Sequence, residues 1–141
     1  MANHPVDLSN DELRELLDTA RKEAEAAGIK VSVTVLDRGG NLLGFVRDRD
    51  ALLISGETST AKAYTSVQLD AATADVVDAV KPDGPFHSLP TALNRPLLFI
   101  AGGVPLRRGG VLVGAIGVGG GAPEQDHEVA TKTAAALALA G

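Results

Sequence analysis

The sequence predicts a single α/β domain of the α+β type, in which helices cover both faces of a mainly antiparallel sheet of five strands. Segments of alternating, β-branched residues follow one another through links short enough for hairpins, which favours antiparallel pairing. Helical periodicity occurs at both ends of the chain and in its middle, so helices can reach both faces of the sheet. The length of 141 residues fits one domain over residues 1–141.

The first predicted element is a helix over residues 10–27. Ser9 and Glu12 have the spacing of a capping box, in which each side chain accepts a hydrogen bond from the backbone of the other. Leucine and alanine then recur at helical spacing. Gly28 follows as a residue suited to end the helix.

A hairpin and a second helix are expected next. Residues 31–36 alternate between apolar and polar side chains and are rich in β-branched residues, which is typical of a strand. Residues 37–41 form turns readily, and residues 42–47 are expected to return as a second strand paired with the first. A helical pattern then begins by Glu57 and carries small and apolar residues on one side as far as Leu69.

The second half of the chain is expected to complete the sheet. A short helix is predicted over 74–80, and a loop rich in proline and glycine continues to Pro90. Short apolar runs separated by glycine then predict three strands, over 97–101, 106–107 and 111–118. The last helix runs from Pro123 to Ala140, with proline at its first position.

Composition and charge exclude several classes of function. The absence of cysteine excludes a disulfide scaffold, a thiolate metal site and a cysteine nucleophile. A net charge of -5, with one tyrosine and no tryptophan, lacks the basic footprint and the stacking surface of a nucleic-acid-binding protein. No apolar run is long enough to cross a bilayer, and the N-terminal residues do not resemble a signal peptide. We therefore expect a cytoplasmic protein with no nucleic-acid or membrane partner.

The glycine-rich segment 117–122 formally matches a dinucleotide-binding fingerprint. No strand follows the next helix and no acidic residue is placed to hold a ribose, so the context disfavours dinucleotide binding. Gly119, Gly120 and Gly121 can instead bring the backbone and the N-terminus of the next helix close to a ligand. Close packing of the backbone against another element or subunit explains the same glycines equally well.

Histidine is scarce, at positions 4, 87 and 127. No pair has the spacing of a helical zinc site. A single histidine is enough to bind haem iron, so His87 and His127 are the candidate metal ligands. Either one can equally be an ordinary surface histidine.

Lys62 lies among alanines on the second helix and can meet a carboxylate, form an ion pair, or act as a Schiff-base nucleophile if desolvated. Glu124, Gln125 and Asp126 begin the last helix, next to the glycines. They can supply a general acid or base, and their charge also suits the positive end of the helix dipole.

Five motifs, taken in order, resemble those of the GlcG/HbpS-type haem-binding family. They are Val35–Leu42, Ala61–Thr65, Gly84–Phe86, Gly102–Leu106 and Gly114–Asp126. The resemblance extends from about Leu13 to Leu139. It departs from the family pattern where Gly119 replaces a serine, where Asp50–Leu52 replaces Asp-Gly-Ala, and where His127 follows Glu-Gln-Asp.

The resemblance implies a profilin-like sandwich that assembles into homo-oligomers. Members of the family include haem-binding sensory proteins and a domain appended to corrinoid adenosyltransferases. The resemblance therefore implies a small-molecule ligand, with haem as the candidate cofactor. We expect its pocket between the Lys62 helix, the Gly102–Gly103 strand and the turn from Gly119 to Asp126.

The leading hypothesis is a haem-binding or haem-handling protein. Its candidate ligand-binding residues are His87, Arg95, Gly102, Gly103, Gly119, Gly120, Gly121 and Gln125. One alternative is a cofactor-independent isomerase or lyase that acts on a small anionic metabolite through Lys62, Asp126 and His127. Another is a non-catalytic oligomeric sensor or scaffold subunit.

Overall fold

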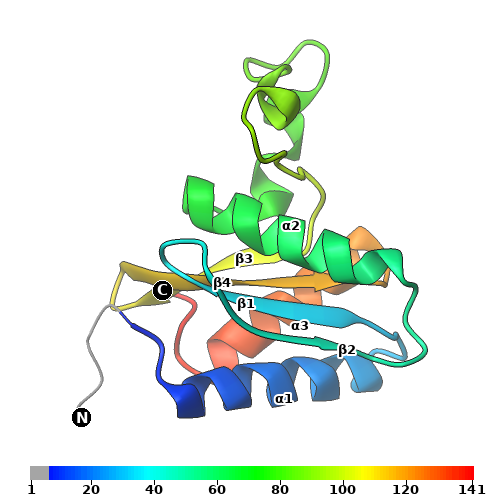
Figure 1. Cartoon of the computed structure of the whole chain (residues 1–141), viewed down its shortest axis with the longest axis vertical. Coiled ribbons are helices and arrows are strands. Elements are labelled where there is room, and N and C mark those ends of the chain that lie inside the picture. Colours follow the sequence, from blue (N-terminus) through cyan, green and yellow to red (C-terminus); the bar gives the residue numbers. More distant parts are fainter. Residues whose placement is uncertain (1–6) are drawn as a thin grey trace.

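The computed structural model describes residues 7–141, and His4 lies outside that range. Seven helices and strands build the body of the molecule (Figure 1). They are α1 (Asn10–Ala26), β1 (Ser32–Asp37), β2 (Leu42–Arg47), α2 (Ile54–Leu69), β3 (Gly103–Arg108), β4 (Val111–Gly119) and α3 (Pro123–Ala136). Three short 3-10 turns lie between α2 and β3, at Thr73–Asp75, Val77–Val80 and Leu89–Thr91.

The sheet is antiparallel throughout and has the strand order β2-β1-β4-β3. α2 covers one face, while α1 and α3 lie together against the other (Figure 1). The mixed α/β class, the antiparallel pairing and the helices on both faces are confirmed. The prediction of five strands is wrong, because the described residues form a sheet of four.

The missing strand is the apolar run 97–101. Leu97 and Phe99 are buried, but the segment makes its backbone hydrogen bonds outside the sheet. The N–H of Leu97 donates to Pro90 O at 3.1 Å, and that of Leu98 donates to Thr65 Oγ1 at 2.8 Å. The apolar pattern therefore indicated burial and not strand pairing. β3 starts at Gly103 instead, and it tolerates a proline because it is an edge strand.

The main core lies between the sheet and the α1/α3 layer. From β1, Val33 and Val35 enter this core, where they meet the buried stripe of α1. Buried residues of that stripe are Leu16, Ala20 and Ala24. The predicted capping box is confirmed, since Ser9 Oγ accepts from the backbone of Glu12 at 3.0 Å and the reverse bond is also present.

The opposite face of the sheet is built from small residues and is in close contact with α2. A Cβ at Gly117 would overlap the carbonyl oxygen of Ser59 in α2. Hydroxyl groups bridge the same interface, because Thr34 Oγ1 lies 3.0 Å from Ser59 Oγ and Ser32 Oγ lies 2.7 Å from Ser55 Oγ. The glycines of β4 therefore serve close packing of the helix on the sheet.

Residues 74–96, which we call the arm, project away from the body on the α2 side (Figure 1). The arm is held by backbone hydrogen bonds such as Phe86 N–H to Ala79 O at 2.8 Å. The predicted short helix over 74–80 is replaced by 3-10 turns. No residue of the arm is buried.

The last helix ends at Ala136, four residues before the predicted end. The chain then turns, with Ala138 at a φ of 57°, and buries Leu139 in the main core. Arg107 N–H donates to Leu139 O at 2.8 Å, so the chain end lies along the edge of β3. Among the described residues, no helix is long and apolar enough to cross a membrane.

Candidate functional site

Lys62 and Asp126 form a buried ion pair between α2 and the start of α3. Their side chains are 5% and 1% exposed, and Lys62 Nζ lies 3.0 Å from Asp126 Oδ2. Lys62 Nζ also donates to Val118 O at 3.0 Å, and Asp126 Oδ1 accepts from Gly121 N–H at 2.9 Å. The pair therefore joins α2, β4, the glycine turn and α3.

Burial raises the pKa of the Asp126 carboxyl above its ordinary value, while the Lys62 ammonium and the backbone N–H groups of Gly121 and Gly120 act in the opposite direction. Each of five surface cavities in residues 7–141 is lined by other residues. The closed pair thus gives a substrate no direct access to these two side chains.

The glycine turn that follows β4 is packed against its neighbours. A Cβ at Gly119 would lie 2.5 Å from Thr58 Oγ1 of α2, and one at Gly121 would lie 2.9 Å from Asp126 Oδ1. Gly120 has a φ of 126°, which favours glycine, and it is exposed. Packing accounts for these glycines in the described chain, and their contact with a ligand stays a prediction.

Gly102 and Gly103 lie at the start of β3, beside Lys62. A Cβ at Gly102 would meet Lys62 Nζ at 2.9 Å, and one at Gly103 would overlap the Lys62 carbonyl oxygen. The backbone N–H of Gly103 donates to Thr73 Oγ1 at 2.9 Å. The structure brings together the three elements of the expected pocket, but they meet as a packed junction around the ion pair.

Gln125 acts as a local cap at the start of α3. Its Oε1 accepts from Ala122 N–H at 2.9 Å. The side chain also lines a cavity of about 270 Å³ between α1 and α3, together with Glu128 and Lys132. Its predicted role as a ligand-binding residue remains a prediction.

The two described histidines lie on different elements. His127, in the first turn of α3, lines a cavity of about 440 Å³ with Arg107 and Thr131. Its Nε2 lies 3.4 Å from Thr131 Oγ1, and its buried Nδ1 has no hydrogen-bond partner among the described residues. His87 is exposed in the arm, with Nδ1 3.2 Å from Val80 O. The structure therefore does not bring them together in one chain.

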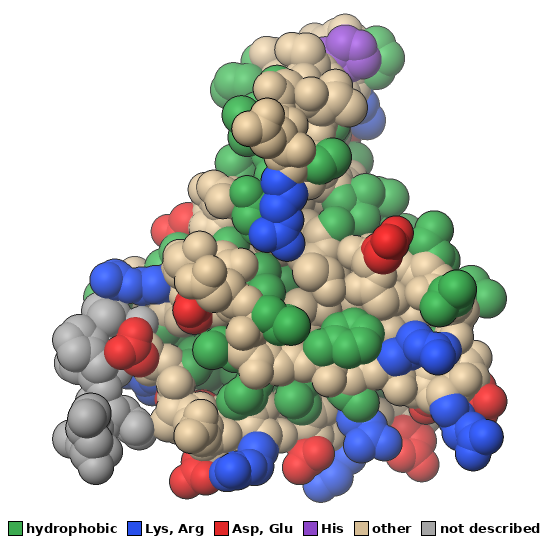
Figure 2. Space-filling view, viewed as in Figure 1, with side chains coloured by type: hydrophobic (Ala, Val, Ile, Leu, Met, Phe, Trp, Pro, Cys, Tyr) green, Lys and Arg blue, Asp and Glu red, His purple; other side chains and the backbone are tan. Residues whose placement is uncertain are grey.

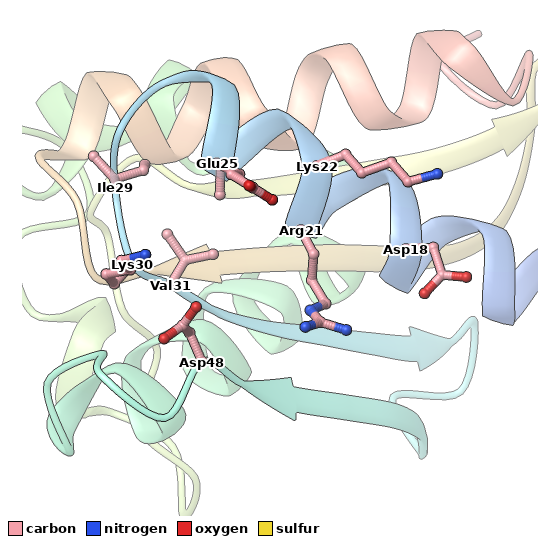
Figure 3. Close-up of a pocket in the computed structure, with 9 residues that line it drawn as sticks. Asp18, Arg21, Lys22, Glu25, Ile29, Lys30, Val31 and Asp48 are labelled. Carbon is pink, nitrogen blue, oxygen red and sulfur yellow. The ribbon is translucent and has the colours of Figure 1, made fainter.

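A charged cavity of about 270 Å³ lies beside α1 (Figure 3). Three cations and three carboxylates surround it, and buried Ala24 and Val31 contribute to its lining. The charged residues are Asp18, Arg21, Lys22, Glu25, Lys30 and Asp48. Because opposite charges alternate at an exposed site, they largely neutralise one another, and none of the predicted site residues lines it.

A more apolar cavity of about 650 Å³, which we call the corner hollow, lies between β2, α2 and the base of the arm. Its lining residues are Phe45, Gly56, Glu57, Thr60, Ala61, Arg95 and Pro96. Arg95 stacks above the Tyr64 ring, with Cζ 3.7 Å from the ring centroid. This contact orients the guanidinium at the rim of an otherwise mostly apolar surface.

The model of the family described as "Haem degrading protein HbpS-like" matches residues 8–135. The chain belongs to the HbpS-like family. Its relatives include a corrinoid adenosyltransferase, PduO, of Salmonella typhimurium, which is 35% identical over 133 residues. That match covers 94% of this chain but 40% of PduO, so the chain spans less than half the length of that curated relative.

Solved structures of relatives share the fold of this HbpS-like chain. The structure described as a PduOC:Heme complex is 34% identical, has a TM-score of 0.88, and is matched over 92% of this chain and 94% of that chain. The Klebsiella pneumoniae protein ORFY is 26% identical, has a TM-score of 0.90, and is matched over 98% of this chain and 96% of its own.

Sequence reasoning found one residue of the corner hollow, Arg95, and missed the rest. The sequence pattern around Phe45 predicted only a strand paired in a hairpin. The pattern around Thr60 predicted only a helix that packs through one side. A signal was nevertheless present, because β2 has exposed apolar residues where a solvent-facing edge strand usually has polar ones. The hollow itself depends on the arm, which has no regular periodicity.

Proposed function

We propose that this HbpS-like chain binds haem, or handles it, as a small ligand-binding protein. The observation that carries the proposal is the corner hollow, where an apolar surface is combined with one oriented cation. Family membership and the haem-complex relative support the same ligand class. Homo-oligomeric assembly is part of the proposal, as the family resemblance implies.

The residues of the hollow fit the two chemical parts of haem. The Phe45 ring, with Ala61 and Pro96, offers carbon surface to a flat porphyrin face, and Arg95 offers its guanidinium to a propionate carboxylate. The volume of about 650 Å³ is in the range of small-molecule pockets. When bound, haem supplies redox and oxygen chemistry at its iron, which the chain's own side chains do not provide.

His87 and His127 remain the candidate iron ligands, and neither lines the corner hollow. Within the hollow, the oxygen-bearing side chains are Glu57 and Thr60. Thr60 Oγ1 is already engaged by the Gly56 carbonyl oxygen at 2.9 Å, whereas Glu57 is exposed at the rim. Mutagenesis is therefore needed to identify which side chain ligates the iron.

Haemin titration of variants tests the proposal. Arg95→Ala is expected to weaken binding by about tenfold or more, since a charge-assisted bond contributes about 1.5–3 kcal/mol. Phe45→Ala should weaken it through lost apolar contact, and Arg38→Ala is the matched control because Arg38 is exposed and lies outside the hollow. A change in the Soret band of His87→Ala or His127→Ala would identify that histidine as an iron ligand, whereas an unchanged band in both would exclude the two histidines, which do not line the hollow. Equal affinity of wild type, Arg95→Ala and Phe45→Ala would refute haem binding in this hollow.

The isomerase or lyase alternative needs Lys62 and Asp126 to contact a substrate, but both side chains are buried in their ion pair. Of its three residues, His127 lines one of the five cavities described above for residues 7–141, beside Arg107. The sensor or scaffold alternative is compatible with the same fold, and its distinguishing property is assembly.

A further inference from the structure

The cavity of about 440 Å³ that His127 lines lies beside the edge strand β3, between the end of α2 and the helix α3, and we call it the edge cavity. No residue of the corner hollow lines it. Buried residues of β3 and α3 give it an apolar part, and these are Val104, Pro105 and Ala134. Polar and charged side chains provide the rest of the lining, so the edge cavity combines the two kinds of surface that small-molecule sites use.

Arg107 brings a cation that is already held in place. Along the edge of the body formed by α1, charged side chains of both signs lie exposed to water (Figure 2). Arg107 differs from these, because its Nε donates to Asp70 Oδ1 at 2.9 Å and its Nη2 donates to Asp70 O at 2.6 Å. A guanidinium has five N–H groups, so Nη1 and the second N–H of Nη2 are left to donate to another acceptor. Such a pair of parallel N–H groups matches the two oxygens of a carboxylate.

His127 adds a further donor to the edge cavity. Its Nδ1 is buried and has no hydrogen-bond partner among residues 7–141. A proton on Nδ1 would be a buried donor without an acceptor, so the neutral ring carries its proton on Nε2. Nε2 lies 3.4 Å from Thr131 Oγ1, which is longer than a good hydrogen bond. A ligand oxygen can therefore accept from Nε2 at lower cost than if the nitrogen were fully bonded.

Asp75 contributes the opposite charge to the same cavity. Its side chain is exposed, and within the described part of the chain it forms no ion pair, whereas the Asp70 carboxylate is occupied by Arg107. One carboxylate and one guanidinium edge thus remain available around one cavity. A ligand with a single negative charge would be repelled by Asp75, and one with a single positive charge would be repelled by Arg107. A ligand with both charges satisfies both groups.

We propose that the edge cavity binds a small zwitterion of the α-amino-acid type, with its carboxylate on Arg107 and His127 and its ammonium on Asp75. The apolar side chain of such a ligand would lie against Val104 and Ala134. The volume of about 440 Å³ is in the range of small-molecule sites. This inference goes beyond haem binding, because it concerns a separate cavity and another class of ligand.

Titration of the full chain with 2-aminobutyrate, followed by proton NMR of the His127 ring at constant pH, tests this site. The ring signal that is lost in His127→Gln assigns the resonance. Butyrate lacks the ammonium of the probe, and propylamine lacks its carboxylate. We expect a saturable shift with 2-aminobutyrate and binding at least about tenfold weaker for each of the other two compounds, since each loses one charge-assisted contact.

Two variants separate the two charges of the ligand. Arg107→Met should weaken 2-aminobutyrate binding at least about tenfold without weakening that of propylamine, and Asp75→Asn should weaken it similarly without weakening that of butyrate. Arg14→Met and Asp78→Asn are the matched controls, because both residues are exposed and neither lines the cavity. Both controls should bind the probe as wild type does. Unchanged far-ultraviolet circular dichroism excludes misfolding, which is expected because neither Arg107 nor Asp75 is buried.

The proposal would be overturned by three results. They are the absence of a saturable shift of the His127 ring, equal binding of all three compounds, and 2-aminobutyrate binding that survives both substitutions. Arg95→Ala, which changes the corner hollow, should bind 2-aminobutyrate as wild type does. Failure of the amino-acid site is therefore distinguishable from failure of haem binding, which the Arg95→Ala and Phe45→Ala variants test with haemin.

Discussion

Replacement of Lys62 by methionine tests the role of the buried ion pair. The substitution keeps an apolar chain of similar length but removes the ammonium that contacts Asp126 Oδ2 and Val118 O, both at 3.0 Å. The Asp126 carboxylate, 1% exposed, would retain the Gly121 N–H but lose its counter-charge. Removing one partner of a buried pair typically costs about 3–5 kcal/mol, a large share of the roughly 5–15 kcal/mol that stabilises a domain.

Denaturant unfolding followed by circular dichroism measures this cost at neutral pH. Lys62→Met combined with Asp126→Asn removes both charges while keeping an oxygen for Gly121, so it should recover most of the lost free energy. Arg14→Met is the control, because the Arg14–Asp11 pair is exposed and contributes at most about 1 kcal/mol. A loss in Lys62→Met as small as that in Arg14→Met would show that the buried Lys62–Asp126 pair stabilises the fold no more than an exposed pair does.

The same variant should show a defined pH dependence. The pKa of Asp126 is already raised in the folded protein by burial, and removing Lys62 takes away a charge that lowers it. The pKa of the Asp126 carboxyl is near 3.8 in the unfolded chain and higher in the folded protein. At a pH between these two pKa values, Asp126 carries a proton in the folded state but not in the unfolded state. The stability of Lys62→Met relative to wild type should therefore fall as pH rises through this window and level off above it. A difference that does not change with pH would contradict a buried, ionisable Asp126.

Two further predictions concern packing and surface charge. Gly117→Ala should destabilise the fold by about 2 kcal/mol or more, because the added Cβ would overlap the Ser59 carbonyl oxygen and force α2 from the sheet. The midpoint of denaturant unfolding measures this loss. A midpoint equal to that of wild type would contradict the close approach of α2 to β4. The pKa of Glu12 is lowered chiefly by its hydrogen bond to Arg108, so it contributes stability that is present above about pH 4.5 and lost as pH falls through the lower folded value. Arg108→Met should reduce this acid-range dependence, leaving the hydrogen bonds with Ser9 to lower the pKa of Glu12, and an unchanged pH profile of the thermal midpoint would count against it.

The elements that sequence predicted correctly are those with strong local signals. The Ser9–Glu12 capping box and the leucine and alanine spacing define α1 without any information from the rest of the chain. The hairpin of β1 and β2 likewise follows from alternation on both sides of a turn. These features depend on residues close together in sequence.

The failures occurred where distant residues decide the structure. Residues 97–101 resemble a strand, but the Thr65 hydroxyl takes the backbone N–H of Leu98 outside the sheet. The glycine-rich segment allowed two interpretations, a ligand loop or close packing, and only the contacts of Gly117 and Gly119 with α2, which lies far away in the sequence, show the packing. The corner hollow combines β2, α2 and the base of the arm, which lie far apart in the chain. No local pattern reports such a juxtaposition.

Haem binding by this HbpS-like chain, as proposed above, is open to a direct measurement. A haemin titration of the wild-type protein, followed by Soret absorbance, tests it most directly. A chain that binds haem at one site should show a shifted Soret band that saturates at one haem per chain. Linear uptake that never saturates, with the spectrum of free haemin, would contradict it.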